Sequence, residues 1–301
     1  MATVGVAETP SASFRPAGRL TLLKEVVRRP SGLFGLVVVL FLLIVAAVPA
    51  FFAPSSVDGQ DIPSRLHGPS WDHLLGTDEL GRDLLSRLIF STRIELGVAV
   101  PSVLGALILG LVLGVVAGYR GGMLDNVLIV VMDSLQAFPT VILALVLLAL
   151  LGSSLQNVII VITVSFIPNY ARVSRALVLA LKNNQFVEAE RSLGASPLRL
   201  VSFHIVPNIV APLFILLAMD IPSAITVEAG LSFLGIGVQP PTASWGVMLS
   251  DGFARVEDSP WGVIAPGLAL MVTTLAFTLL GETLRDVFDP RLSGARRWRR
   301  R

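Results

Sequence analysis

Charged side chains that could bind a partner are grouped in the segment EAERSLGASP, residues 188–197. Two glutamates and an arginine fall within four positions, and a glycine and a proline follow them. Carboxylate and guanidinium groups form strong, directional hydrogen bonds with oppositely charged groups of another molecule. The segment can therefore present charges to a partner, and a solvated loop that only connects two spans is the alternative.

Residue patterns typical of enzymes are missing from the sequence. The chain has no cysteine, and its histidines do not form the H-E-x-x-H pattern of zinc proteases. Its only lysines, Lys24 and Lys182, do not fit the ATP-binding pattern G-x-x-x-x-G-K-[ST], and no G-x-S-x-G nucleophile motif is present. We therefore expect no catalytic residue, no metal site and no cofactor bound by this chain.

Among the polar side chains within the apolar runs, four are candidates to line a translocation pathway: Asp133, Gln136, Asp220 and Glu228. Ionisable groups at membrane depth are costly and commonly mark a substrate or ion pathway. They can also be structural, paired inside a bundle or bonded to kinked backbone. Asp133 is the clearest pathway candidate, and an ion-coupled secondary transporter, which would use such groups, stays open as an alternative.

These residues are positioned by a chain with the composition of a membrane protein. Of its 301 residues, 53% are hydrophobic and 15% are charged, with a mean hydropathy of +0.77, whereas soluble domains have about 25% charged residues. Six apolar runs could each cross a hydrocarbon layer of about 30 Å. They lie near 33–52, 94–117, 127–151, 156–176, 209–233 and 262–281. We predict an all-α integral membrane protein with six transmembrane helices.

The basic residues predict the orientation of the chain. With the N-terminus inside, 18 of the 23 lysines and arginines lie on the inner side, as the positive-inside rule requires. We expect a multi-pass protein of the cytoplasmic (inner) membrane with both termini cytoplasmic. The basic C-terminal end suits anionic lipid headgroups, not nucleic acid. The predicted parts are a tail at 1–32, a transmembrane domain at 33–285 with outer loops 53–92 and 235–261 and a cytoplasmic loop 177–208, and a tail at 286–301.

The cytoplasmic loop 177–208 has the pattern of helix, break and helix. Gly194 can end the first helix in a left-handed conformation, and Ser196 followed by Pro197 is typical of a helix start. An apolar stripe at i, i+3 and i+7 marks one face of the first helix: Phe186, Ala189 and Leu193. We expect this stripe to rest on the bundle while the charged face points into the cytoplasm.

The loop resembles the EAA loop of ABC importer permeases, which reads E-A-A, three residues, G, nine residues, I-x-L-P. The matching positions are Glu188, Ala189, Gly194 and Pro207, and the chain departs from the pattern at Glu190, His204 and Val206. Three further segments, at 75–96, 228–249 and 284–291, resemble motifs of the dipeptide, oligopeptide and nickel branch in the same order. The chain is most similar to the C-type subunit of that branch.

This resemblance implies a type I ABC importer permease fold and a subunit that imports di- or oligopeptides, with nickel or another small solute as the alternative. It implies a second, homologous permease (the B-type subunit), two cytoplasmic ATPase subunits that hold ATP and Mg²⁺, and an extracytoplasmic solute-binding protein as partners. The helix, break and helix of the cytoplasmic loop would form the coupling helix, which passes movement of the ATPases to the transmembrane helices. The residues assigned to coupling are Phe186, Glu188, Ala189, Arg191, Ser192, Gly194 and Pro207.

Two further features concern packing. Gly110, Gly114 and Gly118 recur every four residues, a spacing that lets helices approach closely, and we expect this stripe to pack within the chain. Trp245 and Trp261 are expected at the membrane interface, where amphipathic rings are common.

Overall fold

The computed structural model describes residues 24–288, so most of both predicted tails lies outside the described part. Within that part the chain is helical and forms no β-strand. The long helices are α2 (Pro30–Ala47), α4 (Leu84–Arg120), α7 (Leu155–Leu181), α10 (Val206–Phe233) and α12 (Trp261–Phe288). The shorter ones are α3 (Pro49–Phe52), η1 (Ile62–Ser64), α5 (Gly122–Gln136), α6 (Thr140–Leu151), α8 (Gln185–Ser192), α9 (Pro197–Arg199), the π-helical η2 (Leu200–Ile205) and α11 (Trp245–Phe253).

The predicted third span is bent. Five long helical segments are apolar enough to cross a membrane, and α5 and α6 form a sixth crossing only if they are taken together, because they meet at 93°. The bend lies at Pro139, which precedes α6. Proline has no backbone N–H and disfavours helical geometry in the residue before it, so a continuous helix stops there. Five of the six predicted runs therefore correspond to long helices, the first of them followed by the short α3, and the third run is broken.

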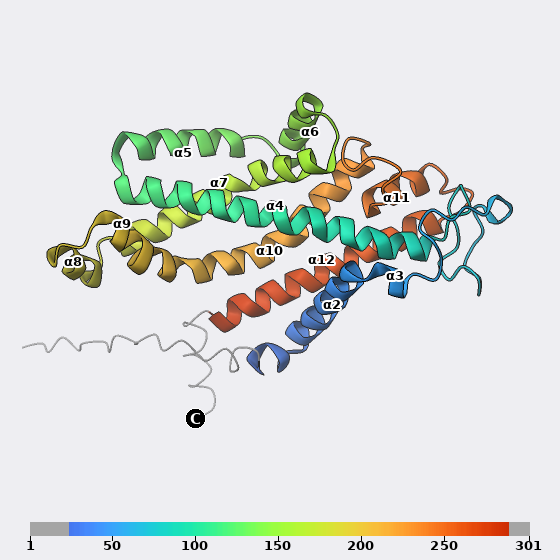
Figure 1. The fold of residues 1–301 in the computed structure, drawn as a ribbon, viewed down its shortest axis with the longest axis horizontal. Coiled ribbons are helices and arrows are strands. Elements are labelled where there is room, and N and C mark those ends of the chain that lie inside the picture. The colour runs from blue at the N-terminus through green and yellow to red at the C-terminus, as the bar shows by residue number, and fades with distance from the viewer. Residues whose placement is uncertain (1–23, 289–301) are drawn as a thin grey trace, which may run out of the picture.

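The most extensive contact between two helices is that of α4 with α7, which run side by side along the bundle (Figure 1). The glycine stripe of α4 makes this approach possible. A Cβ atom on Gly114 would come within 2.3 Å of the Ala171 carbonyl oxygen, and one on Gly110 within 2.4 Å of the Tyr170 Cβ. The prediction that the stripe packs within the chain is confirmed.

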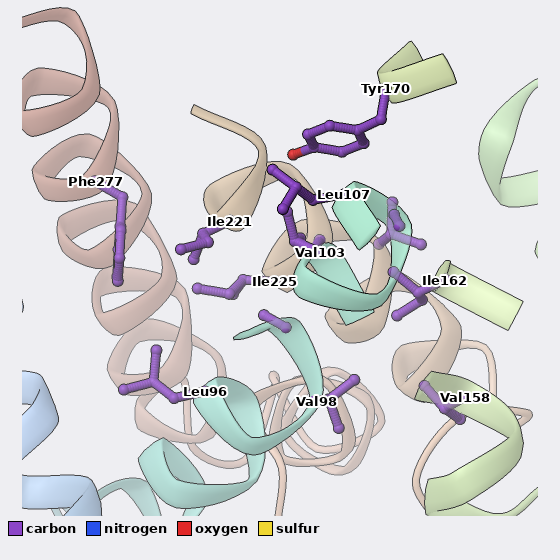
Figure 2. Packing of buried hydrophobic residues seen from close by; sticks show 14 of the residues in the cluster. Leu96, Val98, Val103, Leu107, Val158, Ile162, Tyr170, Ile221, Ile225 and Phe277 are labelled. Atoms are coloured by element: carbon purple, nitrogen blue, oxygen red, sulfur yellow. The ribbon is translucent and has the colours of Figure 1, made fainter. Parts of the chain in front are cut away.

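The apolar core lies among α4, α7, α10 and α12, and Figure 2 shows side chains from all four helices converging. Representative members are Val103 from α4, Ile162 from α7, Ile225 from α10 and Phe277 from α12. Helix α2 covers α12 and part of α4, whereas α5 and α6 lie at one edge and keep many apolar side chains exposed. These exposed residues suit lipid or another membrane subunit.

The two ends of the bundle carry different connections. Helices α8 and α9 lie at one end, and the segment 53–83 lies with α11 at the other (Figure 1). Asp83 ends that segment and caps α4 by accepting a hydrogen bond from the Ser86 backbone N–H at 2.7 Å. Helix α4 therefore begins within the predicted outer loop 53–92, and the predicted loop 235–261 contains a helix of its own.

The prediction for Trp245 is wrong. This side chain is buried among α4, α10 and α11, and its indole N–H donates to the Leu88 carbonyl oxygen at 3.1 Å. A buried indole needs such an acceptor, and the first turns of α4 supply it. Trp245 therefore joins helices inside the protein instead of anchoring the chain in headgroups.

Candidate functional site

The elbow is defined as residues 185–205, which comprise α8, the break, α9 and η2. Gly194 follows α8 with a φ of +85°, in the left-handed region that favours glycine. Ser196 then caps α9 by accepting a hydrogen bond from the Arg199 backbone N–H at 3.4 Å, and Pro197 occupies the first turn. The predicted helix, break and helix are confirmed.

The expected orientation of the elbow's apolar stripe is wrong. All three stripe residues are exposed, and Val187 is the α8 residue that is buried, against η2. Leu193 lies beyond the last helical residue, so the i+7 spacing does not continue one face. The exposed surface of the elbow instead carries large apolar side chains: Leu193 at 84%, Leu198 at 77% and Phe203 at 74% exposed.

The predicted coupling residues share this exposed surface with those apolar side chains. Glu188, Ala189, Arg191, Ser192 and Gly194 are all exposed at the tip of the elbow. Phe186 is exposed on α8, and Pro207 is exposed in the first turn of α10, directly after the elbow. A protein surface that combines charges with exposed leucine and phenylalanine is typical of a docking site.

Two of the residues that depart from the EAA pattern meet inside the elbow. Glu190 Oε2 lies 3.9 Å from His204 Nε2, at the outer limit for an ion pair. The sequence marked both residues as unusual but gave no indication that they face each other. The contact spans the break, from α8 to η2.

A second group of charges lies between α5 and α7. Arg172 donates a hydrogen bond to Asp133 at 2.6 Å, and Arg175 donates two hydrogen bonds to Asp125 at 2.5 and 2.8 Å. Both arginines and Asp133 line a cavity of about 250 Å³ between α4, α5 and α7, whose walls are otherwise mostly apolar. Both arginines are among the basic residues that predict the cytoplasmic side, but their pairing with α5 was not predicted. Opposite charges on two neighbouring spans were the signal available.

The Asp133–Arg172 pair lies partway along the span that begins with α5. The apolar part of α4 ends before Arg120, so α5 begins near the membrane surface. Asp133 is eleven residues further along α5, which corresponds to about 17 Å at 1.5 Å per residue, roughly halfway across a hydrocarbon layer of about 30 Å. Both side chains are more than half exposed at this depth.

The other pathway candidates are placed differently. Gln136 is exposed one turn after Asp133 on α5, and Asp220 on α10 is half-buried with a carboxylate oxygen 3.5 Å from the Asn169 amide nitrogen. Glu228 is completely buried, where it accepts a hydrogen bond from the Ser232 hydroxyl at 2.6 Å. The structure therefore brings Asp133 and Gln136 onto one exposed face and separates Glu228 from them.

Glu228 has a neighbour that the sequence analysis missed. Glu95 of α4 is also fully buried, and its carboxyl group is in contact with that of Glu228. Its Oε1 accepts a hydrogen bond from the Trp245 backbone N–H at 2.7 Å. The two glutamates therefore join α4, α10 and α11 at the end opposite the elbow.

The chain matches a known protein family over most of its bundle. Residues 110–294 match the family described as "Binding-protein-dependent transport system inner membrane component". The dipeptide transport system permease protein DppC of Alkalihalophilus pseudofirmus is 35% identical over 269 residues, which cover 89% of this chain and 88% of the relative. The nickel transport system permease protein NikC of Escherichia coli K12 is 41% identical over 257 residues, covering 85% and 93%.

Other similarities agree with this result. The glutathione transport system permease protein GsiD of Pectobacterium atrosepticum is 38% identical over 271 residues, covering 90% of this chain and 89% of the relative. Among solved structures, the inward-facing MetNI methionine ABC transporter has a chain that superposes with a TM-score of 0.55 at 17% identity, over 67% of this chain and 97% of that one. That similarity supports the type I permease fold.

Proposed function

The chain belongs to the family of binding-protein-dependent transport system inner membrane components and is a permease subunit of an ABC importer, and we propose that this importer carries di- or oligopeptides. Support comes from the relatives, several of which are named dipeptide or peptide permeases. Nickel is the second candidate substrate, because the nickel transport system permease protein NikC is 41% identical to this chain. Family membership favours an ATP-driven importer over the ion-coupled transporter.

The proposed complex divides the work among several chains. A second, homologous permease completes the pathway, two ATPase subunits bind ATP and Mg²⁺ on the cytoplasmic side, and a solute-binding protein delivers substrate from outside. The absence of an ATP-binding motif from this sequence supports the assignment of ATP to partner chains. The elbow end then faces the cytoplasm with both termini, as the distribution of basic residues predicts.

The proposed coupling role of the elbow is supported by the side chains exposed on its surface. Leu193, Leu198 and Phe203 stand free at the end of the bundle, where water would surround them in an isolated chain. Exposed apolar groups of this size beside charged ones favour an occupied interface, and each large apolar side chain gains about 1.5–3 kcal/mol when fully buried. We therefore assign the elbow to the cleft of an ATPase subunit, with Glu188 and Arg191 fixing its orientation.

The Asp133 face supports the proposed translocation pathway. A charged side chain exposed to lipid at the bilayer centre costs at least about 2.5–3.5 kcal/mol, so the half-exposed Asp133–Arg172 pair must face water or a second subunit. Gln136 continues this polar face toward the bend at Pro139. We assign this surface to the pathway formed with the second permease.

Substitution at the break tests the coupling proposal. We expect Gly194→Asp, and separately Glu188→Lys, to abolish substrate uptake and substrate-stimulated ATP hydrolysis in the assembled importer, while the chain still inserts into the membrane. Gly121→Asp is the matched control, because Gly121 also has a positive φ, of 67°, and lies between α4 and α5 with no atom near its missing Cβ. Normal uptake in both elbow variants would remove the coupling role.

A further inference from the structure

The cavity between α4, α5 and α7 has a mostly apolar lining and contains the ion pair of Asp133 and Arg172. Its volume of about 250 Å³ lies just below the range of roughly 300–1,000 Å³ that suits drug-sized ligands. Its apolar lining includes Leu113, Leu128 and Met132, and its charged lining includes Asp133 and Arg172. This composition suits a small solute that has both apolar and charged groups.

The two ion pairs near the cavity differ in their number of hydrogen bonds and in their exposure to solvent. Arg175 binds Asp125 through both guanidinium and carboxylate atoms, and these side chains are 29% and 11% exposed. Arg172 and Asp133 share one hydrogen bond and are 57% and 55% exposed. A bidentate, largely buried ion pair holds two helices together. An exposed pair with one hydrogen bond can separate, and each of its side chains can then bind another charged group.

We propose that Asp133 and Arg172 recognise the two charged ends of a zwitterionic solute, an inference that rests on the proposed peptide-permease function. The solute's ammonium group binds the Asp133 carboxylate, and its terminal carboxylate binds the Arg172 guanidinium. One internal ion pair is thereby exchanged for two, so no charge is left unpaired at membrane depth. The side chains of the solute lie against Leu113, Leu128 and Met132. These apolar residues offer no hydrogen bonds that would distinguish one peptide side chain from another.

The geometry sets a size for the preferred solute. A fully extended dipeptide spans about 7 Å, at up to 3.6 Å per residue, so the two side chains must move apart by a few ångströms to bridge it. Their exposure leaves room for this movement. Longer peptides can engage one end at a time, and a solute with a single charge loses one of the two contacts.

Transport by the whole importer tests the inference. The complex with its second permease, ATPases and binding protein is reconstituted in liposomes, and uptake of radiolabelled dialanine is measured together with dialanine-stimulated ATP hydrolysis. We expect Asp133→Asn and Arg172→Gln each to lower uptake at least tenfold, while stimulated ATP hydrolysis stays within twofold of wild type. Arg172→Lys should recover part of the uptake, and Ser134→Ala, an exposed neighbour on α5, should leave it unchanged.

A double variant separates recognition from a structural role. If the charges only balance each other, Asp133→Asn combined with Arg172→Gln leaves no unpaired charge and restores uptake to near the wild-type level. If they recognise the solute, the double variant is at least as impaired as either single one. Restored uptake overturns the inference alone, as does near-normal uptake in both single variants. Failure of the assembled wild-type complex to take up dialanine would instead overturn the proposed substrate class, and the inference with it.

Discussion

At the α11 end of the bundle several charged side chains are buried, whereas on the surface of the elbow charged side chains are exposed beside large apolar ones. Glu95 and Glu228 are completely buried, and Arg87 is buried with its Nε 3.6 Å from an Asp78 carboxylate oxygen. Burial also raises the pKa of Asp251 in α11, although the nearby Arg87 charge opposes the effect. At the elbow, Glu188 and Arg191 contact no other charged side chain within the described residues.

This difference shows which interactions the chain supplies for itself. Buried polar groups without partners cost about 1–3 kcal/mol each, and at the α11 end the Trp245 backbone N–H donates to Glu95 and the Ser232 hydroxyl donates to Glu228, so that one oxygen of each buried carboxyl group has a donor. The elbow end has no such internal network and leaves its side chains available to another protein. We therefore expect substitutions at the α11 end to lower stability, and substitutions on the elbow to impair coupling without lowering stability.

The largest effect on stability is expected from Gly246→Ala. The new Cβ would lie 2.3 Å from the Ala229 carbonyl oxygen and 2.7 Å from the Ser232 Cβ, so α11 must move away from α10. Overpacking of this kind typically costs about 1–3 kcal/mol, occasionally more, and the melting temperature of the purified complex should fall. Gly230→Ala on the facing helix is the control, because its Cβ would meet nothing within 4 Å. Equal melting temperatures for the two variants would contradict the close packing of this end.

A smaller loss is expected from Glu95→Ala, with Glu95→Gln as its matched control. Alanine removes the acceptor of the Trp245 backbone N–H and leaves that group unpaired, at a cost of about 1–3 kcal/mol. Glutamine keeps an acceptor oxygen for Trp245 and offers an amide donor to Glu228, so it should be close to wild type in thermal unfolding. If glutamine were as destabilising as alanine, the enclosed network would depend on something other than these hydrogen bonds.

The sequence predicted the membrane architecture well because apolar length and helix-breaking residues are local signals. The glycine stripe at Gly110, Gly114 and Gly118 also predicted its own packing, since close approach is what a missing side chain permits. The bend at Pro139 was less evident, because proline inside a membrane helix can be accommodated as a kink or can end the helix, and neighbouring helices decide between the two.

Long-range partners could not be predicted in the same way. Glu95 and Glu228 are 133 positions apart in the chain, and only the crossing of α4 and α10 brings them together. Trp245 likewise looked like an interfacial residue until the fold supplied a buried acceptor for its indole. The elbow's apolar stripe misled for a different reason, because the i, i+3, i+7 pattern continued past the last residue of α8 into the break.

The smallest expected effect is the contribution of the Glu190–His204 contact to the stability of the elbow. Glu190 and His204 bridge the break at 3.9 Å, with side chains 37% and 27% exposed, and such partly solvated pairs contribute about 0–1 kcal/mol. A double-mutant cycle of Glu190→Ala and His204→Ala, followed by thermal unfolding of the complex, should therefore give a coupling energy no larger than about 0.5 kcal/mol, the lower part of that range. A coupling above about 1.5 kcal/mol, which neighbours in one tight network can reach, would mean that the elbow is held rigid from within and resembles the α11 end. A small coupling accompanied by loss of uptake would instead show that Glu190 acts on a partner.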